Sequence, residues 1–279
     1  MLFCDEFHKP MIPLPQLKRK ALRALFRYDP SYNDMFTDKS EAYFARLYLY
    51  QMKPYLEQLE ENAKIMDAGC QAGRFTIPLA KMGFGVTGLD TSPLSLDRAK
   101  MHCRKNGIRP HFIRGEISRV CERLPAGAFD LVICSEVLYL YPHFETLMKW
   151  MMRVLKPDGF LVTSHRTKFY YLTKALLRND LETAQFIVKN REGSLWGTYF
   201  NWQTVEELKT VHEKLGVQTQ GIHPIGIFSE ISFAPGELSL SQQDKLFEIE
   251  KEPFDEVTGC TRYLLAVGKK LSNSYSDLS

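Results

Sequence analysis

The sequence predicts an α/β protein built on a doubly wound, seven-stranded, mostly parallel sheet with helices on both faces. Two observations predict it. Short apolar runs alternate along the chain with segments of helical periodicity, and such alternation requires parallel strands joined by crossover helices. The first apolar run, Ile65–Asp67, also leads through a turn containing Gly69 and Gly73 into the helical segment 74–82. A strand, a glycine turn and a helix in this order are typical of the ligand-binding edge of such sheets.

The remaining elements follow from the same alternation and from the residues that begin and end helices. Ser92 and Pro93 supply a cap and a first-turn proline for the helix after the second strand, and Asn106-Gly107 ends it. Between His165 and Trp196 we expect no strand, only one or two helices over the mouth of the site. The predicted strands are residues 65–67, 86–90, 111–114, 129–134, 160–164, 217–222 and 260–267, and further helices are predicted at residues 144–155 and 203–215.

The chain divides into a main domain with flanking segments. Prolines, a short basic amphipathic stretch and then a helical pattern with a break near Pro54 characterise the N-terminal part, which we expect to form a helical cap. The last residues are polar and are expected to be disordered. The predicted boundaries are residues 1–60 for the cap, 61–270 for the main domain with insertions at about 165–200 and 228–256, and 271–279 for the tail.

Composition is that of an ordinary globular protein. Hydrophobic residues make up 44% of the 279 residues and charged residues 25%, and the net charge of +3 is too small to indicate nucleic-acid binding. No apolar run reaches the ~20 residues that cross a bilayer. The six cysteines include no Cys-x-x-Cys pair, which is typical of reduced thiols and not of a disulfide framework or a zinc site. We therefore expect a cytoplasmic protein without a metal centre or membrane span.

An acidic residue follows the glycine turn at an informative distance. Asp90 ends the second predicted strand, about 20 residues beyond Gly69, the spacing at which this fold presents a carboxylate to ribose hydroxyls. Glycines allow a ligand to approach the backbone closely, and the next helix offers free N–H groups to an anion. Taken alone, the pattern fits equally well a turn that only connects its strand and helix.

Three stretches carry a family resemblance. Residues Asp67–Gly73 resemble the Asp-x-Gly-x-Gly-x-Gly motif of class I S-adenosylmethionine-dependent methyltransferases. Residues Ala128–Leu138 resemble that family's fourth strand, and Arg153–Val162 is similar to the entry into its fifth. Together they cover roughly residues 60 to 165. One position departs from the motif, because Gln71 stands where the family usually has its middle glycine.

The resemblance implies S-adenosylmethionine as cofactor and assigns a site to it. The glycine turn would hold the methionine part, Asp90 the ribose, and residues after the second and third strands the adenine. The end of the fourth strand would border the sulfonium. The cofactor-binding residues expected on this basis are Asp67, Gly69, Cys70, Gln71, Gly73, Asp90, Thr91, Glu116, Ile117, Ser135 and Glu136.

Two histidines are candidates for a general base. His165 directly follows the fifth predicted strand, and His143 lies in the loop after the fourth; either could instead be a hydrogen-bonded loop residue. In the predicted cap, Tyr32, Tyr43 and Arg46 suit contacts with a sulfonium or carboxylate, although the tyrosines could equally pack the helix onto the sheet.

Methyl transfer to a small-molecule acceptor, at oxygen, nitrogen or carbon, is the function we expect. The aromatic-rich segment that includes Phe169, Trp196 and Phe200 suits an apolar acceptor pocket. A methyltransferase acting on RNA or protein is an alternative, with the basic N-terminal stretch as docking surface; no Asn-Pro-Pro-Tyr type motif follows the fourth strand to support it. A non-catalytic cofactor-binding partner subunit is a further alternative, which Gln71 favours.

Overall fold

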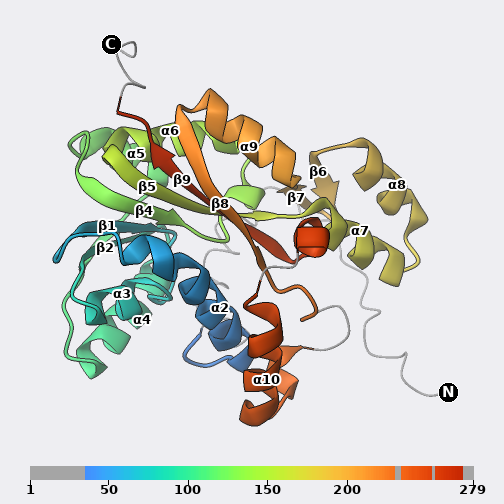
Figure 1. Ribbon diagram of the computed structural model, residues 1–279, viewed down its shortest axis with the longest axis horizontal. Helices are drawn as coiled ribbons and strands as arrows, with labels where there is room; N and C mark the ends of the chain where they lie inside the picture. Colours follow the sequence, from blue (N-terminus) through green and yellow to red (C-terminus); the bar gives the residue numbers. More distant parts are fainter. Residues whose placement is uncertain (1–34, 230–233, 253–254, 273–279) are drawn as a thin grey trace, which may run out of the picture. The chain divides into compact units, whose positions relative to one another are not determined.

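The computed structural model describes residues 35–229, 234–252 and 255–272. Their main sheet has seven strands in the order β3-β2-β1-β4-β5-β9-β8 (Figure 1). β1 to β5 pair in parallel, whereas β9 runs antiparallel to both β5 and β8. The predicted fold class is confirmed. The strands of this sheet are β1 (Lys64–Ala68), β2 (Gly85–Asp90), β3 (His111–Arg114), β4 (Phe129–Cys134), β5 (Leu155–Arg166), β8 (Val217–Ile225) and β9 (Tyr263–Lys270).

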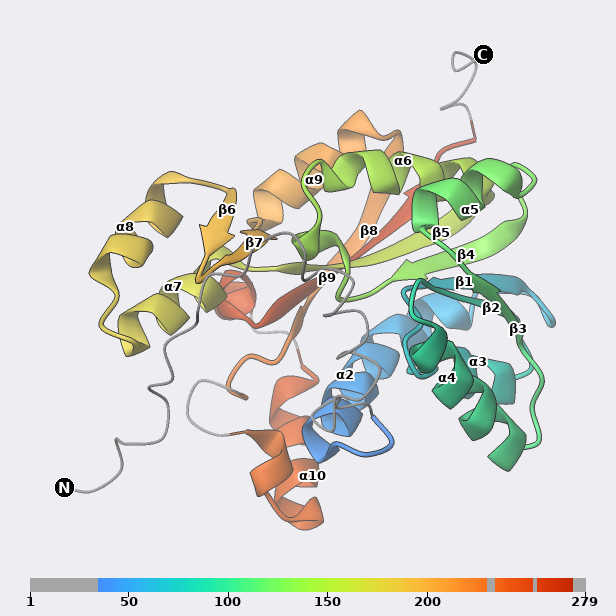
Figure 2. The same ribbon diagram turned by 180° about the vertical axis from the view of Figure 1, so that it is seen from behind.

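Helices cover both faces of this sheet, as Figures 1 and 2 show from opposite sides. α2, α3 and α4 lie on one face, with α10 packed against α2; α5, α6 and α9 lie on the other. The described helices are α2 (Lys39–Leu56), α3 (Thr76–Lys81), α4 (Pro93–Lys105), α5 (Ile117–Arg123), α6 (Phe144–Val154), α7 (Lys168–Leu177), α8 (Leu181–Lys189), α9 (Val205–Lys214) and α10 (Leu240–Glu250), with short 3-10 turns at Leu138–Leu140, Pro235–Glu237 and Asp255–Cys260.

The alternation of side chains along β4 separates two hydrophobic cores. Leu131 and Ile133 pack into the core beneath α2 and α3, whereas Val132 and Cys134 pack into the core beneath α5 and α6. Successive side chains of a strand point to opposite faces, so an uninterrupted apolar run marks a strand that is buried on both sides. This is why residues 129–134 could be predicted as a strand with their observed bounds.

The segment between β5 and α9 differs from its prediction. It contains α7 and α8 as expected, but also a two-stranded antiparallel sheet of β6 (Glu192–Leu195) and β7 (Thr198–Asn201), where we predicted no strand before Trp196. Trp196 and Gly197 form the two-residue turn, with φ of +51° and +83°. Two positive φ values are typical of a tight hairpin turn, which usually has the sequence Asn-Gly. Because tryptophan occupies the first position here, the sequence does not show this hairpin motif.

The helix α2 belongs to the same compact unit as the sheet, residues 34–279. Asp38 caps its start by accepting from the N–H groups of Ser40 and Glu41, at 2.7 and 3.0 Å. Tyr43 donates its hydroxyl to Glu250 of α10 at 2.8 Å. On the same helix Arg46 forms an ion pair with an exposed aspartate of α10. Both residues therefore bind α10, a contact that neither alternative for them included.

Parts of the predicted cap and tail lie outside the described residues. Tyr32 is one of these, as are residues 273–279 of the expected disordered tail. The second predicted insertion, about 228–256, corresponds to the stretch between β8 and β9 that contains α10. Its buried Glu250 accepts from the N–H groups of Phe228 and Ser229, at 2.6 and 2.8 Å, which ties α10 to the end of β8.

Candidate functional site

The candidate site lies at the carboxyl ends of β1, β2 and β4. β1 sits between β2 and β4, and all three run parallel. The connections after β1 and β4 leave on opposite faces of such a sheet, and a ligand crevice forms where they diverge. The structure has a cavity of about 270 Å³ at this point. Residues at the ends of the three strands, or just after them, line it.

Two glycines shape the turn between β1 and α3. Gly69 has a φ of +88°, and a Cβ atom there would lie 2.4 Å from Cγ2 of Val137. Its N–H donates to the carbonyl of Leu89 at 2.7 Å, which ties the end of β1 to β2. Gly73 has a φ of +96°, and a Cβ there would lie 2.8 Å from Ile77. A side chain at either position would be strained and would clash, so this turn requires glycine at both.

Gln71 adopts the left-handed backbone conformation, with a φ of +50°. Glycine reaches this region without strain, whereas other residues do so at a cost of about 1 kcal/mol. The N–H of Gln71 donates to Oδ2 of Asp90 at 2.9 Å, and this bond holds the turn against the end of β2. The departure from the family motif therefore leaves the backbone shape of the turn intact.

Asp90 is the carboxylate that the site presents at the end of β2. Its Oδ1 accepts from the N–H of Ser92 at 2.8 Å and its Oδ2 from the N–H of Gln71 at 2.9 Å. Burial raises the pKa of Asp90, and these backbone donors oppose the rise. A carboxylate offers about four acceptor positions, and the backbone donors of Gln71, Ser92 and Thr91 leave part of this capacity for a ligand. The group therefore fits a ligand hydroxyl.

Asp67 has a different environment, because it is buried and bonded to α3. Its Oδ2 accepts from both the N–H and the hydroxyl of Thr76, at 2.9 and 2.7 Å. Burial raises the pKa of Asp67 to about 6, although the bonds from Thr76 oppose the rise. This carboxylate therefore anchors the helix after the glycine turn to the end of β1, even though it also lines the cavity.

An ion network closes the other side of the cavity. Arg74 donates to the carboxylates of both Glu136 and Glu41. Tyr263 of β9 donates its hydroxyl to the second oxygen of Glu136 at 2.5 Å. The N–H of Glu136 donates to Oγ of Ser164 at 2.6 Å. The carboxylate of Glu136 thus links Arg74, which follows the glycine turn, to Tyr263 of β9. Arg74 in turn links this network to Glu41 of α2.

The charge state of Glu136 follows from its neighbours. Burial disfavours its ionised form, but the guanidinium groups of Arg74, Arg262 and Arg166 outweigh burial and lower the pKa of Glu136 to about 2. The carboxylate is therefore ionised at neutral pH with both oxygens engaged. It positions Arg74 and Tyr263, and it is too weak a base to take a proton from an acceptor at neutral pH.

Comparison with known proteins places this geometry in a family. The sequence model of the family described as "Methyltransferase domain" matches residues 66–163. The ubiquinone biosynthesis O-methyltransferase of Dechloromonas aromatica is 32% identical over 154 residues, 51% of this chain and 66% of the relative. That of Rickettsia prowazekii is 31% identical over 111 residues, 39% of this chain and 43% of the relative. The matches thus span less than two thirds of these relatives.

Solved structures agree on the fold. A methyltransferase from Methanosarcina mazei superposes with a TM-score of 0.56 at 17% identity, and one from Mesorhizobium loti with 0.52 at 19%. Each match covers 78% of this chain and 97% of the other, and both proteins are described as dependent on S-adenosylmethionine. Residues 66–163 thus match the methyltransferase-domain family, and the fold is that of S-adenosylmethionine-dependent methyltransferases. At these identities the structures support the fold, and the matching sequence segment carries the family assignment.

The cavity at the ends of β1, β2 and β4 contains most of the residues that the sequence assigned to the cofactor. Four assigned positions do not line it: Gly73 acts through the turn, Thr91 and Glu116 are exposed, and Ile117 is buried at the start of α5. The adenine contacts assigned to Thr91, Glu116 and Ile117 remain predictions. The assigned residues that line the cavity are Asp67, Gly69, Cys70, Gln71, Asp90, Ser135 and Glu136.

Val137, at the fourth-strand end that the sequence placed beside the sulfonium, also lines the cavity, but sequence reasoning missed three further residues. Arg74 and Phe75 follow the glycine turn, and Tyr139 follows the end of β4. Their positions within three residues of assigned ones are a signal that could have found them, because a loop that forms one wall of a cavity usually presents several side chains to it. Glu41, the second acidic partner of Arg74, has no such local signal, because it comes from α2.

The structure does not support a general base at either histidine. His165 is fully buried, shares a hydrogen bond of 2.9 Å with Thr163 and packs edge-on against Phe144. Burial lowers the pKa of His165 to about 3, and His212 adds to the effect. His143 is exposed at the start of α6, and neither histidine lines the cavity. The predicted strand ended at residue 164, whereas β5 continues to Arg166, so His165 is a strand residue whose ring packs against Phe144 and not toward the cavity.

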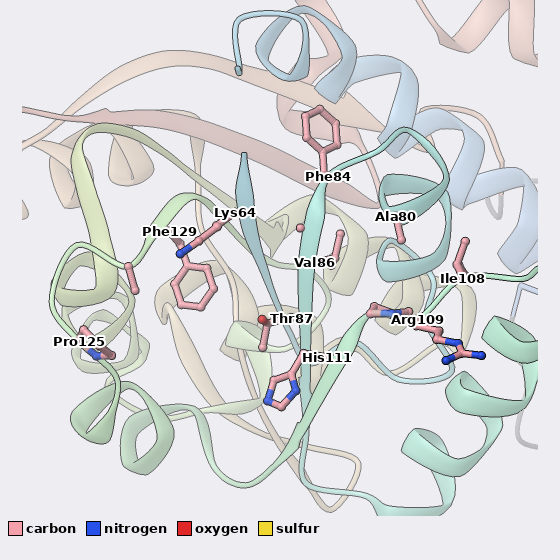
Figure 3. Close-up of a pocket in the computed structure, with 13 residues that line it drawn as sticks. Lys64, Ala80, Phe84, Val86, Thr87, Ile108, Arg109, His111, Pro125 and Phe129 are labelled. Atoms are coloured by element: carbon pink, nitrogen blue, oxygen red, sulfur yellow. The ribbon is translucent and has the colours of Figure 1, made fainter. Parts of the chain in front are cut away.

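A second, larger cavity of about 630 Å³ lies at the opposite edge of the sheet. Figure 3 shows its lining side chains, among them Lys64, Val86, His111 and Phe129, at the beginnings of their strands. Ligands of doubly wound sheets bind at the carboxyl ends of the strands, so we assign the site to the smaller cavity. Within residues 35–229, 234–252 and 255–272, no three His, Cys, Asp or Glu side chains gather as a metal site, and no helix is long and apolar enough to cross a membrane.

Proposed function

We propose that this methyltransferase binds S-adenosylmethionine in the cavity at the ends of β1, β2 and β4 and transfers its methyl group to a small-molecule acceptor. The observation that carries the proposal is Asp90, a half-buried carboxylate that lines the cavity and is held beside the Gly69–Gly73 turn by the N–H of Gln71. Ribose hydroxyls match this acceptor, and the glycine turn leaves room for the remainder of the ligand.

Each wall of the cavity would have a distinct task. When bound, the cofactor supplies an electrophilic methyl group on a sulfonium. The turn from Gly69 to Gly73 would orient the methionine part, and Val137 and Tyr139 would exclude water from the sulfonium side. The protein's main contribution to an in-line displacement is this positioning. α2 would act as the cap of the site, because its Glu41 holds Arg74 of the cavity wall.

We further propose oxygen as the methylated atom. The matching relatives are named O-methyltransferases, which supports this choice. The cavity lining includes no histidine among the described residues, and the ionised Glu136 is fully bonded. An acceptor with an acidic hydroxyl would need no base from the protein, since it can enter as the oxyanion. A reducing, cytoplasmic setting is proposed from the cysteines, of which Cys70, Cys103, Cys121, Cys134 and Cys260 are free thiols.

Conversion of S-adenosylmethionine to S-adenosylhomocysteine tests the proposal. The full chain is incubated with a panel of catechols, phenols, aliphatic amines and thiols, and the product is quantified by mass spectrometry. We expect turnover with a hydroxyl acceptor, at least tenfold less with Asp90→Asn, and unchanged turnover with Asp97→Asn. Asp97 is a matched control because its side chain is exposed on α4. Equal turnover by wild type and Asp90→Asn would contradict the site, and transfer to amines alone would contradict the choice of oxygen.

A further inference from the structure

The larger cavity, at the beginnings of the strands, carries positive charge without negative charge. Its volume is about 630 Å³, and its 13 lining residues include Lys64, Arg109 and His111 but no aspartate or glutamate. The proposed methyl transfer does not use this cavity, because Asp90 and the glycine turn lie at the other edge of the sheet. Cationic side chains with no carboxylate among them favour an anionic ligand.

Three polar residues of the lining come from three neighbouring strands and share one face of the sheet. Lys64 begins β1, Thr87 lies within β2, and His111 begins β3. The residues two positions further along the same strands all pack into the core beneath α5 and α6, namely Met66, Leu89 and Ile113. Side chains two positions apart in a strand point to the same face. Lys64, Thr87 and His111 therefore point to this face too, on one side of β2 in Figure 3.

The register of the sheet brings these three side chains together. Thr87 pairs with His111, so their Cα atoms are about 5 Å apart. Lys64 pairs with Gly85, two residues before Thr87, which places the Cα atoms of Lys64 and Thr87 about 8 Å apart, within reach of a lysine side chain. In Figure 3, Thr87 lies between Lys64 and His111. One anion above Thr87 would face all three donors.

The donors are available to a ligand. In the part of the chain that the structure describes, the side chains of Lys64, Thr87 and His111 form no hydrogen bond or ion pair. The carboxylate of Asp130 accepts from the backbone N–H of Lys64 at 2.8 Å, but its ion pair is with Lys156, at 2.6 Å. The ammonium group of Lys64 therefore keeps a charge that no carboxylate compensates.

Gly85 leaves room beside these donors. A Cβ atom at Gly85 would meet only ordinary contacts, the nearest being the carbonyl oxygen of Asn62 at 3.6 Å. On this face α5 ends at Arg123, so the chain that follows the helix forms the adjoining wall, with Pro125, Ala128 and Phe129. A polar corner next to apolar walls suits a ligand with an apolar body and one anionic end.

We propose that this cavity binds a phosphate monoester with an apolar body, its phosphate lying above Thr87 between Lys64 and His111. The inference goes beyond the proposed function and does not depend on it. A phosphate monoester has three terminal oxygens and about two negative charges at neutral pH. The three donors match the oxygens, and the charges of Lys64 and Arg109 match its charge. A carboxylate, with two oxygens and one charge, would leave a donor and a charge without a partner.

The test uses phenyl phosphate, inorganic phosphate and benzoate as probes. Each is titrated calorimetrically into the full chain, with circular dichroism as a check of folding. We expect phenyl phosphate to bind at least tenfold more tightly than either of the others. Lys64→Met removes the charge, and Gly85→Val fills the cavity from a strand position that accepts a Cβ atom. Each should weaken the binding of phenyl phosphate at least tenfold. Lys149→Met is the matched control, since Lys149 is an exposed lysine of α6 outside the cavity.

Three outcomes would overturn the inference. Equal binding of phenyl phosphate and benzoate by the wild type would refute the phosphate, and this result decides the question even if a variant does not fold. Equal binding of phenyl phosphate and inorganic phosphate would refute the apolar body. Unchanged binding of phenyl phosphate in folded Lys64→Met and Gly85→Val would place the ligand outside this cavity.

Discussion

Glu136→Gln removes one negative charge from the centre of the ion network and preserves the shape of the side chain. The carboxylate of Glu136 accepts from Arg74 and from Tyr263, and 17% of its side chain is exposed. An amide keeps one acceptor oxygen but faces the guanidinium groups with an NH₂ and no charge. Breaking a buried ion pair on one side leaves the other charge without compensation, which typically destabilises a protein strongly.

The pKa of Glu136 gives the size of this effect. It falls from an ordinary value of 4.5 to about 2, against the opposing effect of burial and chiefly through Arg74. That difference corresponds to about 3 kcal/mol of folding free energy at neutral pH. Since the folded state holds the proton less tightly than the unfolded state, this stabilisation is complete above about pH 4.5. It is lost as the pH falls toward 2.

Urea unfolding followed by tryptophan fluorescence measures both the size and the pH dependence. We expect Glu136→Gln to lower the free energy of unfolding by about 3 kcal/mol at pH 7, and by less than half of that at pH 3. Glu192→Gln is the control, because Glu192 also accepts from a tyrosine hydroxyl, that of Tyr199 at 2.6 Å, but on the exposed β6–β7 hairpin. It should cost less than about 0.5 kcal/mol. An effect of Glu136→Gln below about 1 kcal/mol, or one that does not change with pH, would refute the reasoning.

Three substitutions test the turn and its anchor by the same unfolding assay. Gln71→Gly should raise the free energy of unfolding by up to about 1 kcal/mol and preserve S-adenosylhomocysteine binding, because it relieves a φ of +50°; weaker binding would show that the side chain is required. Gly69→Ala should cost roughly 3 kcal/mol through backbone strain and a 2.4 Å contact, whereas Gly83→Ala, at a φ of +96° with open space around it, should cost only about 1; equal costs would exclude the contact. Thr76→Val should cost about 2 kcal/mol by removing the hydroxyl that donates to buried Asp67, and a neutral result would contradict the anchoring role.

The parallel half of the sheet could be predicted because its information is local. β3 lies between Pro110 and Gly115, and β4 contains the apolar run Leu131–Cys134; their observed bounds match the predicted residues 111–114 and 129–134. The position of β9 between β5 and β8 has no local signal, because strand order depends on pairing between distant segments. The β6–β7 hairpin was missed for the opposite reason: its signal is local, but Trp196 replaces the residue that normally marks such a turn.

The residues of the site also divide into those with a local sequence signal and those without one. Gly69, Gln71 and Asp90 lie at fixed spacings after two consecutive strands, so pattern and resemblance located them. Tyr263 reaches Glu136 of the site from β9, far along the chain, and only the assembled sheet shows that they meet. At the end of β5 a shift of one residue decides the outcome, since His165 packs against Phe144 of α6 while its neighbour Arg166 stacks on Tyr263 of β9.

Calorimetry with S-adenosylhomocysteine tests the central claim most directly, which is that Asp90 and the glycine turn form a cofactor site. The full chain is titrated with S-adenosylhomocysteine and with NAD, and the same titrations follow for Asp90→Ala and the control Asp97→Asn, with circular dichroism as a check of folding. We predict micromolar binding of S-adenosylhomocysteine by the wild type and the control, at least a tenfold loss in Asp90→Ala, and no comparable binding of NAD. Unchanged binding in a folded Asp90→Ala, or no binding by the wild type, would contradict the account.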